Sequence, residues 1–141
     1  MAALASLESL MMVTVLTALM WIPYIVSDMM SNGLEVFRYG RLPVPMHGWA
    51  QRAKVAHKNA IENLVVFFPI VFLCHVYEVP GVDNAAMLYF ISRVLHWPAC
   101  VFSDKLPYVR TICFFAGWCA IMIMSKKCLD KCNADKAAGV H

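Results

Sequence analysis

A polar segment of twelve residues, RAKVAHKNAIEN at positions 52–63, stands directly before the apolar run Leu64–Cys74. The apolar run has 11 residues, which as a helix extend over only about 16 Å at roughly 1.5 Å per residue. It cannot cross a hydrocarbon core of about 30 Å by itself, so in a membrane helix the polar end must enter the bilayer or its boundary. Ionisable groups are unfavourable there and normally face a bundle interior or a wet cavity. The segment predicts a polar, anion-binding pocket inside a helical membrane protein.

The composition supports a membrane protein. Of the 141 residues, 61% are hydrophobic and only 15% are charged, whereas a soluble domain carries about 25% charged residues. Four apolar blocks predict membrane helices at about residues 4–27, 49–77, 84–102 and 108–125. Short connections between them favour an all-α fold, a four-helix up-and-down bundle that forms a single integral membrane domain over residues 1–125. We expect residues 126–141 to be a polar, frayed C-terminal tail.

The first apolar block has an alternative interpretation as a cleaved signal peptide. A signal peptide begins with basic residues before its apolar core, but this block has none, and Glu8 stands where a positive charge is expected. Pro23 and Tyr24 do not resemble the small-residue cleavage site of a signal peptide. We therefore expect a retained membrane helix.

The polar side chains of the second block share faces of one helix. Arg52 and Asn59 are seven residues apart, and Glu62 follows Asn59 by about one turn. Lys58 and Glu62 are four apart and can form an ion pair. A solvated helix end would explain any one of these residues alone. The short apolar remainder favours a functional or packing-critical polar site, because Asn59 and Glu62 cannot both be solvated in a helix that crosses the bilayer.

Arg93 and His96 lie three residues apart on one face of the third apolar block. A buried arginine needs a partner, and Glu62 is the candidate counter-ion within the membrane. Such an ion pair could simply lock two helices together, or it could belong to a catalytic site, and both interpretations stay open. A single histidine such as His96 is more often a packed side chain than an acid or a base. Pro98 removes a helix hydrogen bond and is expected to bend this helix.

Arg110 stands near the start of the fourth block, where the beginning of a helix adds the positive end of its dipole. Arg52, Lys58 and Arg110 could therefore converge around a small anion near one membrane face. The alternative is that these cations only anchor the helix ends to lipid headgroups.

Three motifs together resemble the MAPEG family, the membrane-associated proteins in eicosanoid and glutathione metabolism. They are RAKVAHKNAIEN followed by apolar residues and Pro69, the sequence RVLH at residues 93–96, and KLPYVRT at residues 105–111. The resemblance covers essentially the whole chain. It implies a homotrimer of four-helix subunits, with glutathione bound between neighbouring subunits near the cytosolic face. The membrane would be the endoplasmic reticulum or another intracellular membrane in a eukaryote, and the inner membrane in a bacterium.

The resemblance assigns a glutathione-binding role to the second helix. Asn59 and Glu62 would hold the amine and backbone of glutathione, and Lys58 stands where the family often has a basic residue. Val55 occupies a position where many members carry a glutathione-binding arginine. Arg52, almost one turn earlier, or Lys54, directly before it, could compensate for that departure.

The same implied site includes residues of the third and fourth helices. Arg93, with His96 on the same face, would tie helices together or contact the glutathione carboxylates. Arg110 would be the catalytic residue that stabilises the glutathione thiolate, because a nearby cation lowers the pKa of a thiol. The thiolate would then attack a small hydrophobic electrophile or reduce a lipid hydroperoxide. Cys100 stands where a tyrosine is common in the family, and Phe114 lacks a hydroxyl that some of the enzymes have.

Two classes of function therefore stay open. The first is a glutathione-dependent membrane transferase or peroxidase that acts on a hydrophobic electrophile or a lipid hydroperoxide. The second is a non-catalytic family member that serves as a structural or regulatory membrane subunit. A proton-coupled transporter is a more distant third interpretation, because the sequence shows no inverted repeat.

The six cysteines do not indicate a metal centre. Four lie in apolar blocks, where cysteine behaves as a small hydrophobe, and Cys128 and Cys132 are four apart without histidine partners. The net charge of +3 is small, so nucleic acid is not an expected partner. The expected partners are the lipid bilayer, a small hydrophobic substrate and other copies of the chain.

Overall fold

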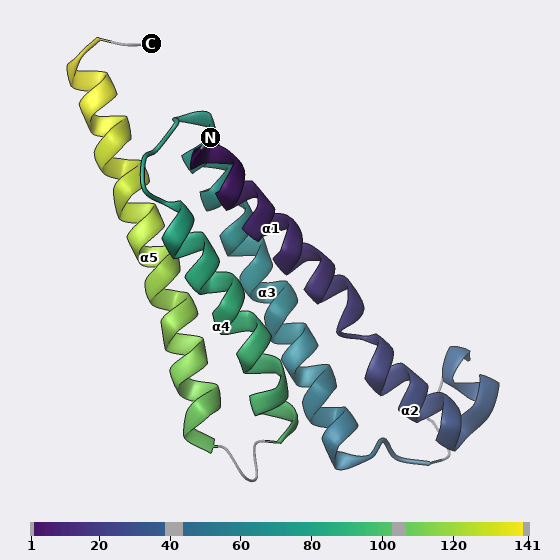
Figure 1. Ribbon diagram of the computed structural model, residues 1–141. Coiled ribbons are helices and arrows are strands. Elements are labelled where there is room, and N and C mark those ends of the chain that lie inside the picture. The colour runs from purple at the N-terminus through teal and green to yellow at the C-terminus, as the bar shows by residue number, and fades with distance from the viewer. Residues whose placement is uncertain (1, 39–43, 103–106, 140–141) are drawn as a thin grey trace.

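The computed structural model describes residues 2–38, 44–102 and 107–139, and its regular elements are all helices (Figure 1). In chain order they are α1 (Ala2–Leu19), α2 (Ile22–Asn32), the short 3-10 helix η1 (Gly33–Phe37), α3 (Gly48–Val76), α4 (Asp83–Val101) and α5 (Pro107–Ala137). The all-α prediction is confirmed for the described ranges. The start of the KLPYVRT motif, at residues 105 and 106, lies outside them.

The long helices α1, α3, α4 and α5 lie side by side and alternate in direction (Figure 1). Helix α4 packs against α1, α3 and α5, while α2 extends the line of α1 and packs against the beginning of α3. The start of α3, the end of α4 and the start of α5 meet at one end of the bundle (Figure 1). The turn between α3 and α4 closes the other end, with Glu78 at φ 49° and Gly81 at φ 68°.

The first predicted helix, residues 4–27, is interrupted in the structure. Helix α1 ends at Leu19, and α2 begins at Ile22 and continues to Asn32. Pro23 stands in the first turn of α2. It has no N–H to donate to the carbonyl of Leu19, four residues earlier, so a continuous helix would lose that hydrogen bond. Proline is well accommodated in a first turn, where the N–H has no helical partner.

The last helix is longer than predicted. We expected it to end near residue 125 with a frayed tail, but α5 continues through residues 126–137. Three contacts hold this part: Lys131 Nζ lies 2.5 Å from a carboxylate oxygen of Asp135, Lys127 Nζ donates to the carbonyl of Gly81 at 2.7 Å, and Cys128 packs against the buried core. Favourable pairs at a spacing of four residues support a helix that is otherwise polar.

Three stretches are long and apolar enough to cross a membrane: Ala5–Phe37, Gly48–Val76 and Tyr108–Ala137. Helix α4 has 19 residues but carries Asp83, Arg93 and His96, and it is not among these stretches. We expected four membrane-length apolar helices, and the structure confirms three of them. Large apolar side chains stay exposed on the outside of the bundle, Val65, Phe68 and Phe72 of α3 among them. An exposed apolar surface of this kind suits lipid or another subunit.

Candidate functional site

A cavity of about 260 Å³ lies between α3, α4 and α5, at the end of the bundle where α5 begins. Three predicted site residues line it: Asn59 from α3, His96 from α4 and Arg110 from α5. The complete wall consists of Val55, Ala56, Asn59, His96, Cys100, Arg110, Thr111 and Phe114. We call this space the first cavity. Beside its apolar residues, the wall has one cation, one amide, one imidazole, one thiol and one hydroxyl.

An adjoining cavity of about 290 Å³ shares Val55, Cys100 and Arg110 with the first. Arg52, another predicted site residue, lines it. Arg52 Nε donates to the carbonyl of Val101 at 2.8 Å, at the last residue of α4. A cation is favourable at the negative end of a helix dipole. The contact therefore ties the start of α3 to the end of α4 and keeps Arg52 beside the adjoining cavity.

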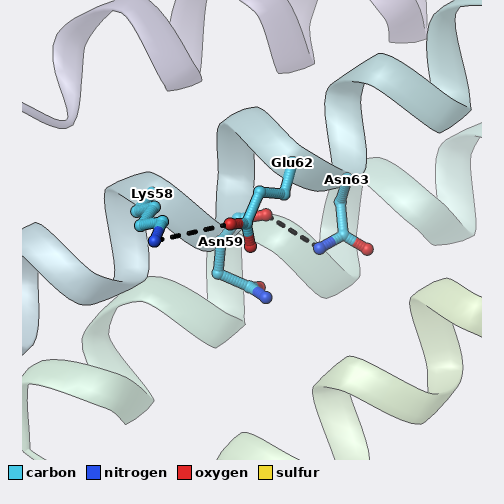
Figure 2. A network of polar contacts seen from close by, with 4 residues as sticks. All are labelled: Lys58, Asn59, Glu62 and Asn63. Atoms are coloured by element: carbon cyan, nitrogen blue, oxygen red, sulfur yellow. Dashed lines mark hydrogen bonds and ion pairs between the residues drawn. The ribbon is translucent and has the colours of Figure 1, made fainter.

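The side chain of Asn59, on α3, has an unused hydrogen-bond acceptor. Its backbone carbonyl accepts a hydrogen bond from the Asn63 amide at 2.8 Å, and Figure 2 shows its side-chain amide turned away from the Lys58–Glu62 pair. The Asn59 Oδ1 atom is buried and has no hydrogen-bond partner among the described residues. A buried acceptor without a partner is unfavourable by about 1–3 kcal/mol. Asn59 is therefore an open acceptor beside the first cavity.

Lys58 and Glu62 lie on a different face of α3. Lys58 Nζ is 3.9 Å from a carboxylate oxygen of Glu62, and their side chains are 79% and 59% exposed. Both line a separate hollow of about 560 Å³ on the side of α3 that faces α2, together with Tyr24 and Ile61. Within a single chain, the predicted convergence of Arg52, Lys58 and Arg110 is therefore wrong for Lys58.

The predicted ion pair between Arg93 and Glu62 does not form within the described chain, because Glu62 faces outward with Lys58. Arg93 is 4% exposed. Its guanidinium carbon lies 4.9 Å from the ring centre of Tyr89 and 5.7 Å from that of Phe114, and Nη2 donates to the Phe114 carbonyl at 3.4 Å. Aromatic faces attract a guanidinium and take the place that we assigned to a carboxylate. Nε and Nη1 of Arg93 have no partner among the described side chains and backbone.

Gly117 of α5 makes room for this guanidinium. A Cβ atom at position 117 would overlap Nη2 of Arg93 and lie 2.7 Å from Oγ of Ser92. Sequence reasoning overlooked both Gly117 and Tyr89. A glycine inside an otherwise apolar helix indicates a close approach of a neighbouring group, so Gly117 was the signal available in the sequence.

His96 is 7% exposed and contacts Cys100, which follows it by one turn of α4. The Cys100 Sγ atom lies 3.6 Å from Nδ1 and 3.6 Å from Nε2 of the imidazole. The ring also packs near Phe114, with 6.5 Å between ring centroids. Arg110, in the first turn of α5, is exposed and lines both cavities. The arrangement can therefore bind an anion at Arg110 while apolar groups contact the remaining wall.

The model of the MAPEG family matches residues 5–129. No curated protein and no solved structure matches the chain. The family match includes α2, α3 and α4 completely, α1 from residue 5 onward and α5 as far as residue 129, and every residue that lines the first cavity lies within it. Three of the helices are also long and apolar enough to cross a membrane. The chain therefore belongs to the MAPEG family, the membrane-associated proteins of eicosanoid and glutathione metabolism.

Proposed function

We propose that this protein is a glutathione-dependent membrane transferase or peroxidase that acts on a hydrophobic electrophile or a lipid hydroperoxide. The observation that carries the proposal is that Asn59, His96 and Arg110, which come from three helices, line one cavity. Family membership supports a role connected with glutathione. The apolar wall made by Val55 and Phe114 suits a hydrophobic second substrate.

Arg110 is the catalytic residue in this proposal. Its guanidinium stabilises the glutathione thiolate, which is the nucleophilic form of the thiol. With an electrophilic substrate the thiolate forms a C–S bond as the leaving group departs with its electron pair. With a hydroperoxide, two glutathione molecules become a disulfide, and the products are an alcohol and water. Asn59 and Arg52 provide an acceptor and a cation for the glutathione backbone and carboxylates.

A homotrimer is part of the proposal. Lys58 and Glu62 are exposed in one subunit and do not line the cavity that contains Arg110. Val55 and Ile61, on the same helix, are 67% and 46% exposed. A second subunit packed on this side of α3 would cover these apolar groups. It would also allow Lys58 and Glu62 to take part in a site shared by two subunits.

Thermal unfolding of the detergent-purified protein, measured across a titration with S-hexylglutathione, tests glutathione binding. A ligand that binds only the folded protein stabilises it by mass action, by about 2.7 kcal/mol at a hundred times its Kd. We expect the melting temperature to rise with ligand concentration in the wild type and much less in Arg110→Ala.

Arg38→Ala is the matched control, because Arg38 is exposed, pairs with Glu35 at 2.8 Å and lines neither cavity. It should respond to the ligand as the wild type does. An unchanged melting temperature of the wild type at millimolar ligand would refute glutathione binding.

A non-catalytic membrane subunit is the second candidate function. The observation that favours it is that Val55, Cys100 and Phe114 all line the first cavity, at positions where enzymes that the chain resembles have an arginine, a tyrosine or a hydroxyl. This function predicts no turnover with aryl halides or lipid hydroperoxides, together with a membrane protein that co-purifies in fixed stoichiometry. Native mass spectrometry would distinguish such a hetero-complex from a homotrimer.

A further inference from the structure

Cys100 lies where the first and the adjoining cavity meet. It lines both of them, whereas none of the other five cysteines, all within the described residues, lines either. Cys100 belongs to a buried cluster with Ala56 and Ala60, and it also forms part of the wall of the space in which a ligand would bind.

The environment of the Cys100 thiol contains a base and a cation. The imidazole of His96 lies 3.6 Å from Sγ, measured to either ring nitrogen, which is within hydrogen-bonding distance for a sulfur atom. Arg110 lines the same two cavities. Neither cavity has a carboxylate among the described residues of its wall. A thiol beside a histidine is an arrangement that activates a nucleophile, and a nearby cation favours the thiolate.

The walls indicate the chemical class of the ligand. Val55, Ala56 and Phe114 make most of the first cavity apolar, and its volume of about 260 Å³ suits a small molecule. Arg110 and Thr111 lie in the same wall, and a guanidinium and a hydroxyl are both able to donate a hydrogen bond to an oxygen atom of the ligand. The ligand that fits is an apolar molecule whose reactive carbon is close to a carbonyl oxygen.

We propose that Cys100 is a second reactive thiol of this site, which adds covalently to small apolar α,β-unsaturated carbonyl compounds. The thiol transfers its proton to His96, and the sulfur forms a bond to the β-carbon. The electrons of the C=C bond move toward the carbonyl, whose oxygen becomes negative opposite Arg110. His96 then returns the proton to the α-carbon. The product is a thioether, and the step uses no oxidant, no reductant and no glutathione.

Covalent labelling of the detergent-purified wild-type protein with trans-2-nonenal, in the absence of glutathione, tests this inference. Intact mass should show a single adduct under limiting reagent, and peptide mapping after borohydride reduction should place it on Cys100. Two cysteines serve as internal references, the buried Cys113 and the exposed Cys119. We expect Cys100 to react at least about ten times faster than either, since general-base assistance contributes about 100-fold or more.

Two variants separate activation from simple accessibility. His96→Gln should lower the labelling rate of Cys100 at least about tenfold, because the base is removed, while the labelling of Cys119 stays unchanged. Cys113→Ser should keep the adduct and Cys100→Ser should abolish it. Equal labelling of Cys100, Cys113 and Cys119 in the wild type would overturn the proposal without any variant. A His96→Gln protein that folds and labels at the wild-type rate would overturn it as well.

This inference and the proposed glutathione chemistry fail separately. Rapid labelling of Cys100 without any thermal response to S-hexylglutathione would support the reactivity of the Cys100 thiol and refute glutathione binding. A thermal response with slow, unselective labelling would support glutathione binding and reduce Cys100 to a packing residue.

Discussion

The two ends of the bundle are packed differently. At the end closed by the turn between α3 and α4, large side chains fill the space: Phe67 stacks on Tyr89 with 3.8 Å between ring centroids and 12° between ring planes, and Met124 is fully buried. At the end where α5 begins, the buried positions of α3 are small, with alanine at residues 50, 53, 56 and 60, and two cavities lie there.

Helix α3 therefore changes role along its length. Small residues let neighbouring helices approach, but they leave space wherever the facing helices diverge, and polar groups such as Asn59 can then border that space. The larger side chains of α3 beyond position 64 fill the space between the helices. Side-chain size, more than polarity, therefore decides which end of this bundle is core and which can be a site. Four substitutions test this division.

Phe67→Ala should cause the largest loss of stability. Phe67 is fully buried, and truncating a buried phenylalanine lowers the free energy of unfolding by about 3–5 kcal/mol. The thermal response to S-hexylglutathione should be kept, since Phe67 lines neither cavity. Thermal unfolding in detergent with and without ligand measures both effects. Loss of the ligand response in a folded Phe67→Ala protein would show that the two ends are coupled.

Arg110→Ala should produce the reverse pattern. Removing one group that stabilises developing negative charge lowers turnover by about 100- to 1000-fold, whereas an exposed arginine contributes little to stability. Glutathione turnover with an aryl halide and the melting temperature are the two measurements. Arg38→Ala should change neither. Comparable turnover in Arg110→Ala and the wild type would exclude Arg110 as the catalytic residue.

Gly117→Ala should destabilise the boundary between the two ends by about 1–3 kcal/mol, which is typical of overpacking. The added methyl group would displace the Arg93 guanidinium from its place over Tyr89 and Phe114. Gly48→Ala is the matched control, because a Cβ there would meet only Arg52 at an ordinary 3.7 Å.

A double-mutant cycle identifies the cause of the Gly117→Ala effect. Combining Gly117→Ala with Arg93→Met should give less than the sum of the two single losses, because neighbouring residues couple. Additive losses in the unfolding free energy would show that the methyl group clashes with something other than Arg93.

Asp135→Ala should have the smallest effect. It removes the pair with Lys131 near the end of α5, and a pair four residues apart on a helix contributes about 0.2–0.5 kcal/mol. The melting temperature should hardly change, while amide hydrogen exchange in the last turns should become faster. Unchanged exchange there would show that the contact between Lys127 and Gly81 is sufficient to hold the segment.

The sequence was informative where spacing along one helix decides the outcome. The seven-residue spacing of Arg52 and Asn59, with Arg110 near a helix start, predicted polar residues close to one another, and these three line the two cavities at one end of the bundle. It also indicated that Lys58 and Glu62 can pair, and they do.

Contacts between helices were less predictable. The spacing of Arg93 and His96 identifies their shared face but not what that face meets, so aromatic rings in place of a carboxylate could not be foreseen. We assigned Glu62 to the bundle interior because the apolar run after it is short. The length of that run does not determine on which face of the helix the Glu62 carboxylate lies. The length of α5 was underestimated because the Lys131–Asp135 pair and the contact with Gly81 stabilise a segment whose composition is that of a polar tail.

The length of α5 has a mechanical consequence. A helix of 31 residues measures about 46 Å at roughly 1.5 Å per residue, and a tilt of about 20° would still leave about 43 Å along the membrane normal. The hydrocarbon layer is only about 30 Å thick, so a crossing that starts at the first turn of α5 would leave roughly the last third of the helix outside it, with Lys126 and the later lysines hydrated. The last turns of α5, up to Ala137, would then extend beyond the headgroups as a continuous helix. A fluorophore on Cys132 would report the aqueous side, and one on Cys119 would report the lipid, within the same helix.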